Sequence, residues 1–238
     1  MIDLINENIK LKNFDKNFIN YYYNIFLPNY NSIVSKVFYG IFHYNYLCNS
    51  CGEIINQEFK DFQYIELDIN SYENYKSKLD DSLINIYLDE IIEFYFNQKI
   101  SSLKQKCRKC QNTNENKIEN KIYIFPKIII FYINWGKFDS GKGFIALEDN
   151  KLIFDEIIDL TKYSFYKGEI KYKIRSIINY PIINENNEDD SMPKKFVTFN
   201  RHIVDEKFYC YQPSGEMVEI HNFNRKKFIP SVLFYEKE

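Results

Sequence analysis

Four of the five cysteines of this 238-residue chain form two pairs with the spacing C-x-x-C. The first pair is Cys48 and Cys51, in "CNSC", and the second is Cys107 and Cys110, in "CRKC". Two such knuckles can present four thiolates tetrahedrally to one zinc ion, which has no geometric preference that opposes this arrangement. The pattern therefore predicts a structural zinc site that holds together two segments distant in the sequence and stabilises the fold.

Other roles for these cysteines fit the sequence less well. An odd total of five cysteines is not typical of a disulfide framework. A redox motif needs only one C-x-x-C, usually at the start of a helix in a βαβ unit, and "KCRKC" (106–110) has no such setting. Four unligated cysteines are the remaining alternative, and the number and type of the side chains favour zinc over it.

A catalytic nucleophile and base outside the knuckles would have to come from very few residues. Cys210 is the only other cysteine, and the three histidines are His43, His202 and His221. Cys210 and His202 on neighbouring strands form a conceivable thiol–imidazole pair. The simpler interpretation is that Cys210 is a small buried side chain in an aromatic strand, and that His202 lies in a turn or at the surface.

The charges of the chain nearly balance, with 31 Lys and Arg against 33 Asp and Glu and a formal net charge of −2. A protein that binds nucleic acid chiefly through phosphates usually has a strong basic excess. One basic cluster surrounds the second knuckle: Lys104, Lys106, Arg108 and Lys109. It could contact nucleic acid, but a solvated surface is the simpler interpretation.

The first forty residues and one later segment have helical patterns. "NFDKNFINYYYNIF" has apolar positions that can share one helix face, and "NSIVSKVFYG" runs from a candidate cap at Asn31 to Gly40, a typical residue after a helix end. "DSLINIYLDEIIEF" (81–94) has apolar residues at helical spacing, with Asp81 or Ser82 as the expected cap.

From about residue 121 onward, short segments rich in β-branched and aromatic residues predict strands. They are "KIYIFPKIIIFYINW", "NKLIFDEIIDL", "IKYKIRSIINYPII", "KKFVTFNRH", "KFYCYQ", "EMVEI" and "SVLFYEKE". "QPSGE" (212–216) is expected to form a hairpin turn, and the polar stretches 111–121 and 184–190 are expected to be loops. The sequence therefore predicts an α+β fold, with helices first and a large, mainly antiparallel sheet after them.

The sequence also predicts where the protein works. Residues 1–20 place charges between the apolar positions, which is not typical of a signal peptide. The longest apolar stretch, "IIIFYINW" (128–135), has the length of a buried strand and is too short for a membrane span. We therefore expect a protein of the cytosol or nucleus.

The order and spacing of these segments resemble the C-terminal part of the catalytic domain of the ubiquitin-specific proteases (USPs), which are papain-like, cysteine-type deubiquitinases. "NSIVSKVFYGIFHYNYLCNSCGEIINQEFKDFQYIELDI" resembles the family's "S-I-x-x-x-F-x-G" stretch, its first zinc knuckle and the following strand. "SLINIYLDEIIEF" and "CRKC" resemble the helix before the second knuckle and that knuckle, while "IFPKIIIFYINW" and "FIPSVLFYEKE" resemble two strands of the family's palm.

This resemblance implies a single hand-like USP domain: a helical remnant of the thumb at 1–40, zinc-binding fingers at 41–125 and a β palm at 126–238. In the family the fingers carry the four-cysteine zinc site and cradle the body of ubiquitin. The thumb supplies the catalytic cysteine, and most of the thumb, including its cysteine box, has no counterpart in this sequence.

The resemblance also locates the remaining catalytic positions. The family's "G-H-Y-x-A-Y" corresponds to "KKFVTF", so that Lys195 stands at the histidine position, and Gln212 falls in the region of the orienting Asp or Asn. A lysine with an ordinary pKa is a cation at pH 7 and cannot accept the thiol proton. We therefore expect an inactive pseudo-deubiquitinase that binds ubiquitin or a ubiquitin-like protein, or scaffolds an active partner.

Two alternatives remain open at the level of the sequence. The chain could be the C-terminal part of an active cysteine-type deubiquitinase whose cysteine-bearing half is missing. It could also be a zinc-ribbon module that binds nucleic acid, although the near-neutral charge disfavours this.

Overall fold

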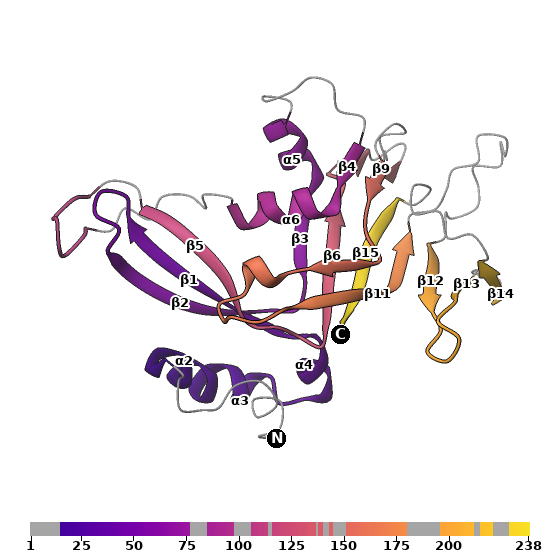
Figure 1. Ribbon diagram of the computed structural model, residues 1–238, viewed down its shortest axis with the longest axis horizontal. Coiled ribbons are helices and arrows are strands. Elements are labelled where there is room, and N and C mark those ends of the chain that lie inside the picture. The colour runs from indigo at the N-terminus through magenta and orange to yellow at the C-terminus, as the bar shows by residue number, and fades with distance from the viewer. Residues whose placement is uncertain are drawn as a thin grey trace. The chain divides into compact units, whose positions relative to one another are not determined.

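The computed structural model describes residues 15–76, 85–97, 106–113, 116–136, 138–139, 143–144, 151–179, 196–211, 215–220 and 229–238. Figure 1 colours the chain by residue number from the N-terminus to the C-terminus. The chain divides into two compact units, each made of segments that are not continuous in the sequence. Unit 1 comprises Met1–Gln63, Phe96–Ile129 and Thr161–Gly168, and unit 2 comprises Tyr64–Tyr95, Ile130–Leu160 and Glu169–Glu238. Within the described residues, no helix has the length and apolar character needed to cross a membrane.

The described part of unit 1 begins with four short helical segments, as the sequence predicts for this region. They are α2 (Lys16–Tyr21), the π-helical turn η2 (Tyr22–Phe26), α3 (Leu27–Asn29) and α4 (Ile33–Phe38). The cap of α4 is Ser32 and not Asn31, because the Ser32 hydroxyl accepts from the Ser35 N–H and the Ser35 hydroxyl accepts from the Ser32 N–H. Gly40 directly follows the C-cap residue Tyr39, as predicted, and it is also the first residue of the next strand.

A narrow three-stranded sheet follows, in the order β2-β1-β5 (Figure 1). Its strands are β1 (Gly40–Cys48), β2 (Ile54–Phe62) and β5 (Asn116–Ile124), and both neighbours pair antiparallel with the central β1. The prediction of a loop over 111–121 is wrong from residue 116 onward. The polar side chains of that stretch fit an edge strand, and the register that pairs Cys48 with Asn116 lets β1 satisfy its backbone groups.

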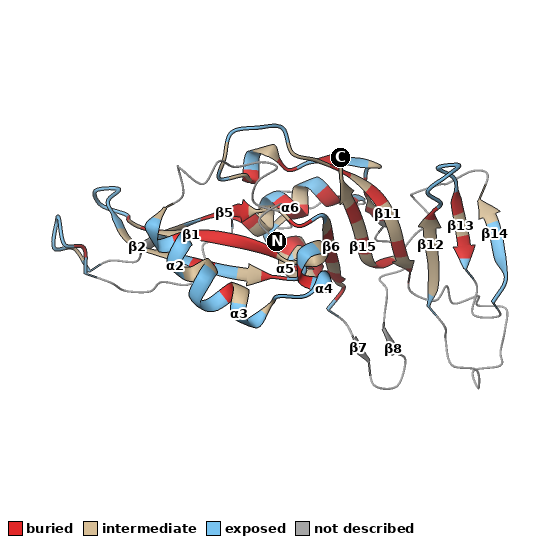
Figure 2. Ribbon diagram, turned by 90° about the horizontal axis from the view of Figure 1, so that it is seen from below, coloured by how far each residue is buried: buried red, intermediate tan, exposed pale blue. Residues whose placement is uncertain are grey.

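The helices cover one face of this sheet with an aromatic core. Figure 2 shows β1 mostly buried beneath them. The buried residues of the core are Phe18, Phe26, Ile41, Phe59 and Tyr123. The ring of Phe18 lies 4.3 Å from that of Tyr123 and 5.3 Å from that of Phe59. Because rings pack well on a pleated surface, the unusually aromatic sequence folds here as a helix-on-sheet layer.

Unit 2 contains an eight-stranded sheet, in the order β14-β13-β12-β11-β15-β6-β3, with β10 paired to β11. The bounds of these strands are β3 (Ile65–Asp68), β6 (Ile128–Asn134), β10 (Ile157–Asp159), β11 (Lys171–Asn179), β12 (Val197–Arg201), β13 (Phe208–Tyr211), β14 (Met217–Ile220) and β15 (Pro230–Lys237). The pairs from β10 to β15 are antiparallel, whereas β3 runs parallel to β6. The predicted α+β class and mainly antiparallel sheet are therefore confirmed.

The remaining elements lie mostly in unit 2. They are α5 (Ile69–Lys76), β4 (Asn85–Tyr87), α6 (Leu88–Asn97), β7 (Phe138–Asp139), β8 (Gly143–Phe144), β9 (Lys151–Ile153) and, in unit 1, η3 (Thr161–Tyr163). The predicted helix over 81–94 is confirmed in α6, where Ile91 and Ile92 are buried. Its start is wrong, because Asn85–Tyr87 pairs in parallel with β9 and a strand cannot also be a helix turn. Asp81 and Ser82 lie outside the described residues, as do 184–190.

Candidate functional site

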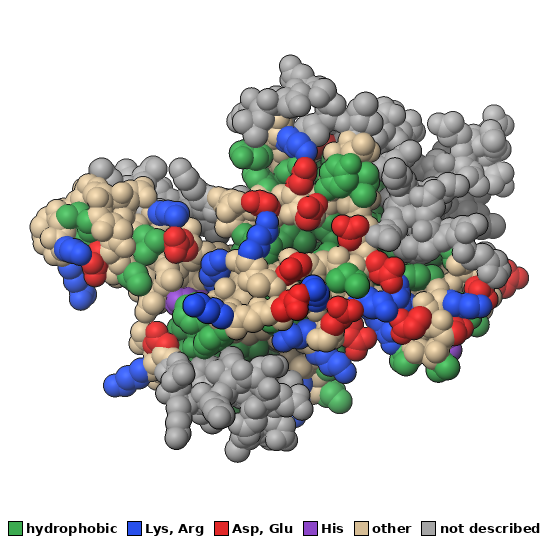
Figure 3. All heavy atoms as spheres, in the orientation of Figure 1, with side chains coloured by type: hydrophobic (Ala, Val, Ile, Leu, Met, Phe, Trp, Pro, Cys, Tyr) green, Lys and Arg blue, Asp and Glu red, His purple; other side chains and the backbone are tan. Residues whose placement is uncertain are grey.

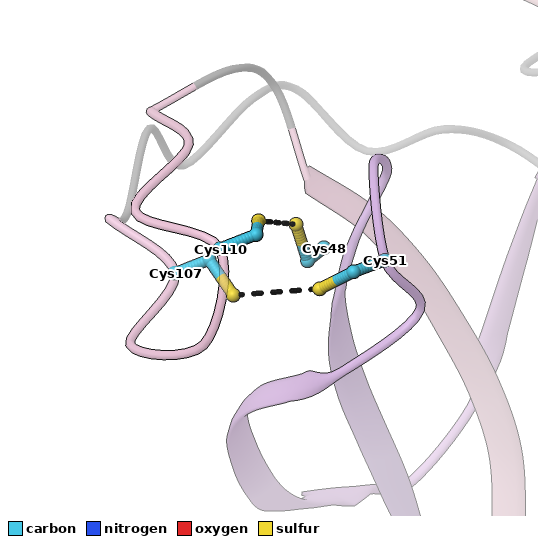
Figure 4. Close-up of side chains that lie close together, drawn as sticks. All are labelled: Cys48, Cys51, Cys107 and Cys110. Atoms are coloured by element: carbon cyan, nitrogen blue, oxygen red, sulfur yellow. Dashed lines mark hydrogen bonds between the residues drawn. The ribbon is translucent and has the colours of Figure 1, made fainter.

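The four knuckle cysteines lie together at one end of the three-stranded sheet (Figure 4). All four Sγ atoms are within 4.8 Å of one another, with 3.5 Å between Cys48 and Cys110 and 3.7 Å between Cys51 and Cys107. These distances are far from the roughly 2.05 Å of a disulfide. A tetrahedral zinc ion with Zn–S bonds of about 2.3 Å separates its sulfurs by roughly 3.8 Å. The sulfur arrangement therefore fits a tetrahedral metal ion.

Strand topology brings the two knuckles together. The first knuckle is the turn between β1 and β2, and it begins at Cys48, the last residue of β1. The second knuckle precedes β5, whose first residue, Asn116, pairs with Cys48. Since β2 and β5 flank the same central strand, both knuckles lie at the same end of the sheet.

The two knuckles have the same backbone conformation. In each knuckle, the backbone N–H of the first cysteine donates to the carbonyl of the residue five positions later. The carbonyl of the same cysteine accepts from the backbone N–H of the residue four positions later. These bonds are Cys48 to Glu53 (2.9 Å), Gly52 to Cys48 (2.8 Å), Cys107 to Asn112 (2.9 Å) and Gln111 to Cys107 (2.9 Å). The residue four positions on is left-handed in both, with φ of 70° at Gly52 and 62° at Gln111. The same turn is thus built twice, around two equivalent pairs of sulfurs.

Backbone N–H groups favour thiolates at this site. The N–H of Ser50, together with that of Cys51, lowers the pKa of the Cys48 thiol to about 6. The N–H of Cys110, together with that of Lys109, lowers the pKa of Cys107. The pKa of the Cys51 thiol and that of the Cys110 thiol are raised, so the turns alone prepare only two of the four sulfurs for a metal, which binds the thiolate form.

Polar contacts also join the knuckles directly. Lys109 Nζ lies 3.0 Å from Glu53 Oε2, and the Asn112 amide donates to the Ser50 hydroxyl. Cys48 and Cys107 are buried, whereas Cys51 and Cys110 are exposed. The site is therefore partly shielded and already held in register by side chains other than cysteine.

The basic cluster around the second knuckle does not act as a unit. Lys109 is paired with Glu53, Lys106 and Arg108 are exposed, and Lys104 lies outside the described residues. Figure 3 shows basic and acidic side chains interspersed over the displayed face of the described residues, with no extended patch of one sign. This distribution agrees with the solvated-surface interpretation.

The structure does not bring Cys210 and His202 together. Cys210 lies in the middle of β13, opposite Phe199, and His202 follows three residues after Phe199, which is roughly 10 Å along a strand. Burial raises the pKa of the Cys210 thiol, and His202 Nδ1 contacts Asp205 Oδ1 at 3.1 Å in an exposed turn. Both residues agree with the structural interpretation.

Three other candidate positions, Lys195, Gln212 and His221, lie outside the described residues. His43 is described, and it is buried in the aromatic core of unit 1, stacked on Phe59 at 4.7 Å. Burial lowers its pKa, and it lies outside the group of side chains that could ligate a metal.

The sequence pattern did not predict a role for Arg201, a buried arginine in unit 2. Arg201 is only 6% exposed, and it donates to Glu156, contacts Glu206 Oε2 at 3.1 Å and lies 4.8 Å over the Phe208 ring. It therefore joins the end of β12 to the segment before β10 and to the turn before β13. A single arginine beside His202 in "FNRH" carries no sequence signal for this role.

No family model matches the sequence, and neither does any curated protein. Solved structures do match. A chain of the yeast SAGA DUB module is 15% identical, with 96% of this chain and 46% of that chain covered and a TM-score of 0.66. A chain of the SAGA Ubp8/Sgf11/Sus1/Sgf73 DUB module bound to ubiquitin aldehyde is 15% identical, with 94% and 48% covered and a TM-score of 0.68.

A third similar structure is the same module bound to monoubiquitin, with 16% identity, 94% of this chain and 47% of that chain covered, and a TM-score of 0.65. The chain thus spans less than half the length of the solved chains that it matches. At these identities the likeness establishes the fold. Together with the antiparallel sheets and the four-cysteine cluster, it shows that this chain has a USP-like fold.

Proposed function

We propose that this chain is a USP-like domain that binds ubiquitin or a ubiquitin-like protein, or holds an active partner protein, without catalysing hydrolysis itself. The observation that carries the proposal is the fold. Chains of similar fold occur in DUB modules bound to monoubiquitin and to ubiquitin aldehyde, and these modules contain further subunits. A cytosolic or nuclear location would suit such a role.

The proposed inactivity rests on the residue types at the family's catalytic positions. By resemblance, Lys195 stands where the histidine would be and Gln212 where the orienting acid would be. A lysine with the usual pKa of about 10.4 keeps its proton at pH 7, so it cannot serve as a general base. The burial of Cys210, with its raised thiol pKa, supports the absence of an alternative nucleophile among the described residues.

We further propose that the ion in the knuckles is zinc and that its role is structural. Four cysteines as the donor set and no open position fit structural zinc, with iron as the other metal of tetrahedral sulfur sites. The ion would clamp the β1–β2 turn to the start of β5. In this proposal, residues 41–125 form zinc-bearing fingers between a helical segment (1–40) and a palm (126–238).

Two measurements on the full chain test the function. Calorimetric titration with ubiquitin should detect binding, and incubation with ubiquitin carrying an electrophile at its C-terminus should give no covalent adduct. The matched control is Lys195→His, which supplies an imidazole and no nucleophile, so it should remain unlabelled. If no ubiquitin binding is detected up to millimolar concentration, the proposed ubiquitin-binding role is refuted. If the unmodified chain forms a covalent adduct, the proposed inactivity is refuted.

The coverage of the solved chains favours a second candidate function. Because this chain spans under half of each of them, it could act as one part of an active cysteine-type deubiquitinase. A longer product of the same gene would then react with the electrophilic ubiquitin through a cysteine outside these 238 residues. Lys195 argues against this candidate, since the base would still be missing.

A further inference from the structure

The turn that joins β12 to β13 in unit 2 has the hydrogen bonds of the two cysteine knuckles (Figure 1). The N–H of His202 donates to the carbonyl of Lys207 at 2.8 Å, and the N–H of Glu206 donates to the carbonyl of His202 at 3.0 Å. Glu206, four positions after His202, is left-handed with φ of 58°. Both knuckles have the same two bonds and a left-handed residue at the same position, so the backbone of this turn repeats theirs.

The left-handed residue is uncommon in this chain as well as in proteins generally. Residues other than glycine rarely adopt a positive φ. Among the described residues only Gln111 and Glu206 do so, and each is the fourth residue after the first position of its turn. A turn of this kind also occurs in ordinary hairpin loops, so the side chains decide whether it is a binding site.

The side chains at the two ligand positions of this turn are both of metal-binding type. His202 stands at the position of the first cysteine of a knuckle, and Asp205 stands at the position of the second. In the second knuckle the N–H of Asn112 donates to the Cys110 sulfur. In the β12–β13 turn the equivalent N–H, that of Lys207, donates to Asp205 Oδ1 at 3.1 Å. The second ligand position is therefore oriented in the same way by the backbone two residues later.

The two ligand atoms lie at a distance that suits one ion. His202 Nδ1 is 3.1 Å from Asp205 Oδ1. A tetrahedral zinc ion with bonds of about 2.1 Å to nitrogen and oxygen separates these two atoms by roughly 3.4 Å. The side chains are 50% and 35% exposed, so an ion from solvent can reach both.

The other contacts of Asp205 are compatible with an ion. The Tyr209 hydroxyl donates to Asp205 Oδ2 at 2.7 Å, which fixes the carboxylate and leaves Oδ1 facing His202. The Tyr209 ring also lies 5.8 Å from the His202 ring, in an edge-to-face arrangement. Carboxylates that bind metals are commonly held by such an outer hydrogen bond.

The basic side chains around the turn are paired with carboxylates. Lys207 Nζ lies 2.8 Å from Glu219 Oε1, and Lys173 Nζ lies 2.9 Å from Glu206 Oε2. Arg201 also contacts Glu206. Because each of these positive charges has a negative partner, together they do not form a field that would exclude a cation.

We propose that the β12–β13 turn binds a divalent transition-metal ion, such as zinc, through His202 Nδ1 and Asp205 Oδ1, with water at the remaining positions. Imidazole and carboxylate are both common zinc ligands. In the bound form the neutral ring carries its proton on Nε2, so that Nδ1 is free to coordinate. With only two protein ligands, this site is open and exchangeable, in contrast to the closed site that four cysteines can form.

The test is a zinc titration of the full chain, followed by NMR. The chain first receives one equivalent of zinc for the four cysteines, and further zinc is then added. We expect the further zinc to shift the ring signals of His202 and the amide signals of 203–207. The amide signals of 49–51 and 108–109 report separately on the cysteine knuckles, and they should stay unchanged in this second phase. Magnesium, which prefers oxygen ligands, should not reproduce the shifts.

Substitutions in the turn identify the ligands. His202→Gln and Asp205→Asn should each weaken zinc binding by at least about 10-fold, since loss of an outer partner alone costs 10- to 100-fold. Tyr209→Phe keeps both ligands and removes the hydrogen bond to Asp205, so it should weaken binding by about 10-fold. The matched control is Val204→Ser, which changes an 86% exposed residue of the same turn that offers no ligand and should leave the affinity unchanged.

Three outcomes would overturn the proposal. They are no shift of the 202–207 signals at millimolar zinc, equal shifts with magnesium, and an effect of Val204→Ser as large as that of Asp205→Asn. Asparagine retains an oxygen that accepts from the Lys207 N–H, so this variant is expected to keep the turn. None of these outcomes depends on whether the chain binds ubiquitin.

Discussion

Removing the proposed metal ion from the knuckles should lower the free energy of unfolding by about 4 kcal/mol. The ion would link Cys51 and Cys107, which are 56 residues apart in the sequence. A cross-link that closes a loop of this length removes about 4 kcal/mol of chain entropy from the unfolded state. The clamp would hold an edge strand, β5, to the end of β1.

The assay is urea unfolding of the reduced full chain, followed by far-UV circular dichroism, with and without a high-affinity zinc chelator. Chelation should shift the midpoint to lower urea, and readdition of zinc should restore it. The metal content should be one zinc per chain in the unmodified protein and in Cys210→Ala, whereas Cys107→Ser should lose it. The control substitution removes a thiol that does not belong to the cluster.

Two results would refute this reasoning. One is a metal content near zero in fully reduced, folded protein, because the convergence of the sulfurs would then have another cause. The other is an unfolding midpoint that chelation leaves unchanged, because the ion would then make no contribution to folding. A coloured protein with one iron per chain would show that the four cysteines bind iron and not zinc. The proposal that a metal ion links the two knuckles would still hold.

Three further substitutions test the packing of the two units, each by urea unfolding. Gly40→Ala should cost about 1–3 kcal/mol, because its new Cβ would come within 2.3 Å of the Phe62 ring. Arg201→Met should cost about 1–3 kcal/mol, because Glu156 and Glu206 lose their buried partner. Burial lowers the pKa of His43 in the folded state, so the unfolded chain binds this proton first as the pH falls. The free energy of unfolding should therefore decrease as the pH drops below about 6.5. His43→Phe should make this decrease smaller. An unchanged midpoint in either of the first two variants, or an unchanged pH dependence in the third, would contradict the contact concerned.

Local patterns predicted the elements where side chain and backbone preferences agree. Segments such as 171–179 and 230–237 are rich in β-branched and aromatic residues, and both form central strands. The apolar spacing over 88–94 gave α6 for the same reason. The predictions of secondary structure were wrong where pairing with another strand determined the backbone conformation. Asn85–Tyr87 pairs with β9 and Asn116–Lys121 pairs with β1, and neither partner is adjacent in sequence.

The cysteine spacing determined which four residues form the cluster, because C-x-x-C turns favour a shared ion whatever the fold around them. Only the tertiary structure decided that the knuckles share one turn geometry and meet at one end of β1, since strand pairing sets that register. It also separated Cys210 from His202 and placed Arg201 beside Glu156 and Glu206, because strand pairing and packing bring side chains together from different segments. Residue types fix which chemistry is available, and long-range packing fixes which groups are close enough to perform it.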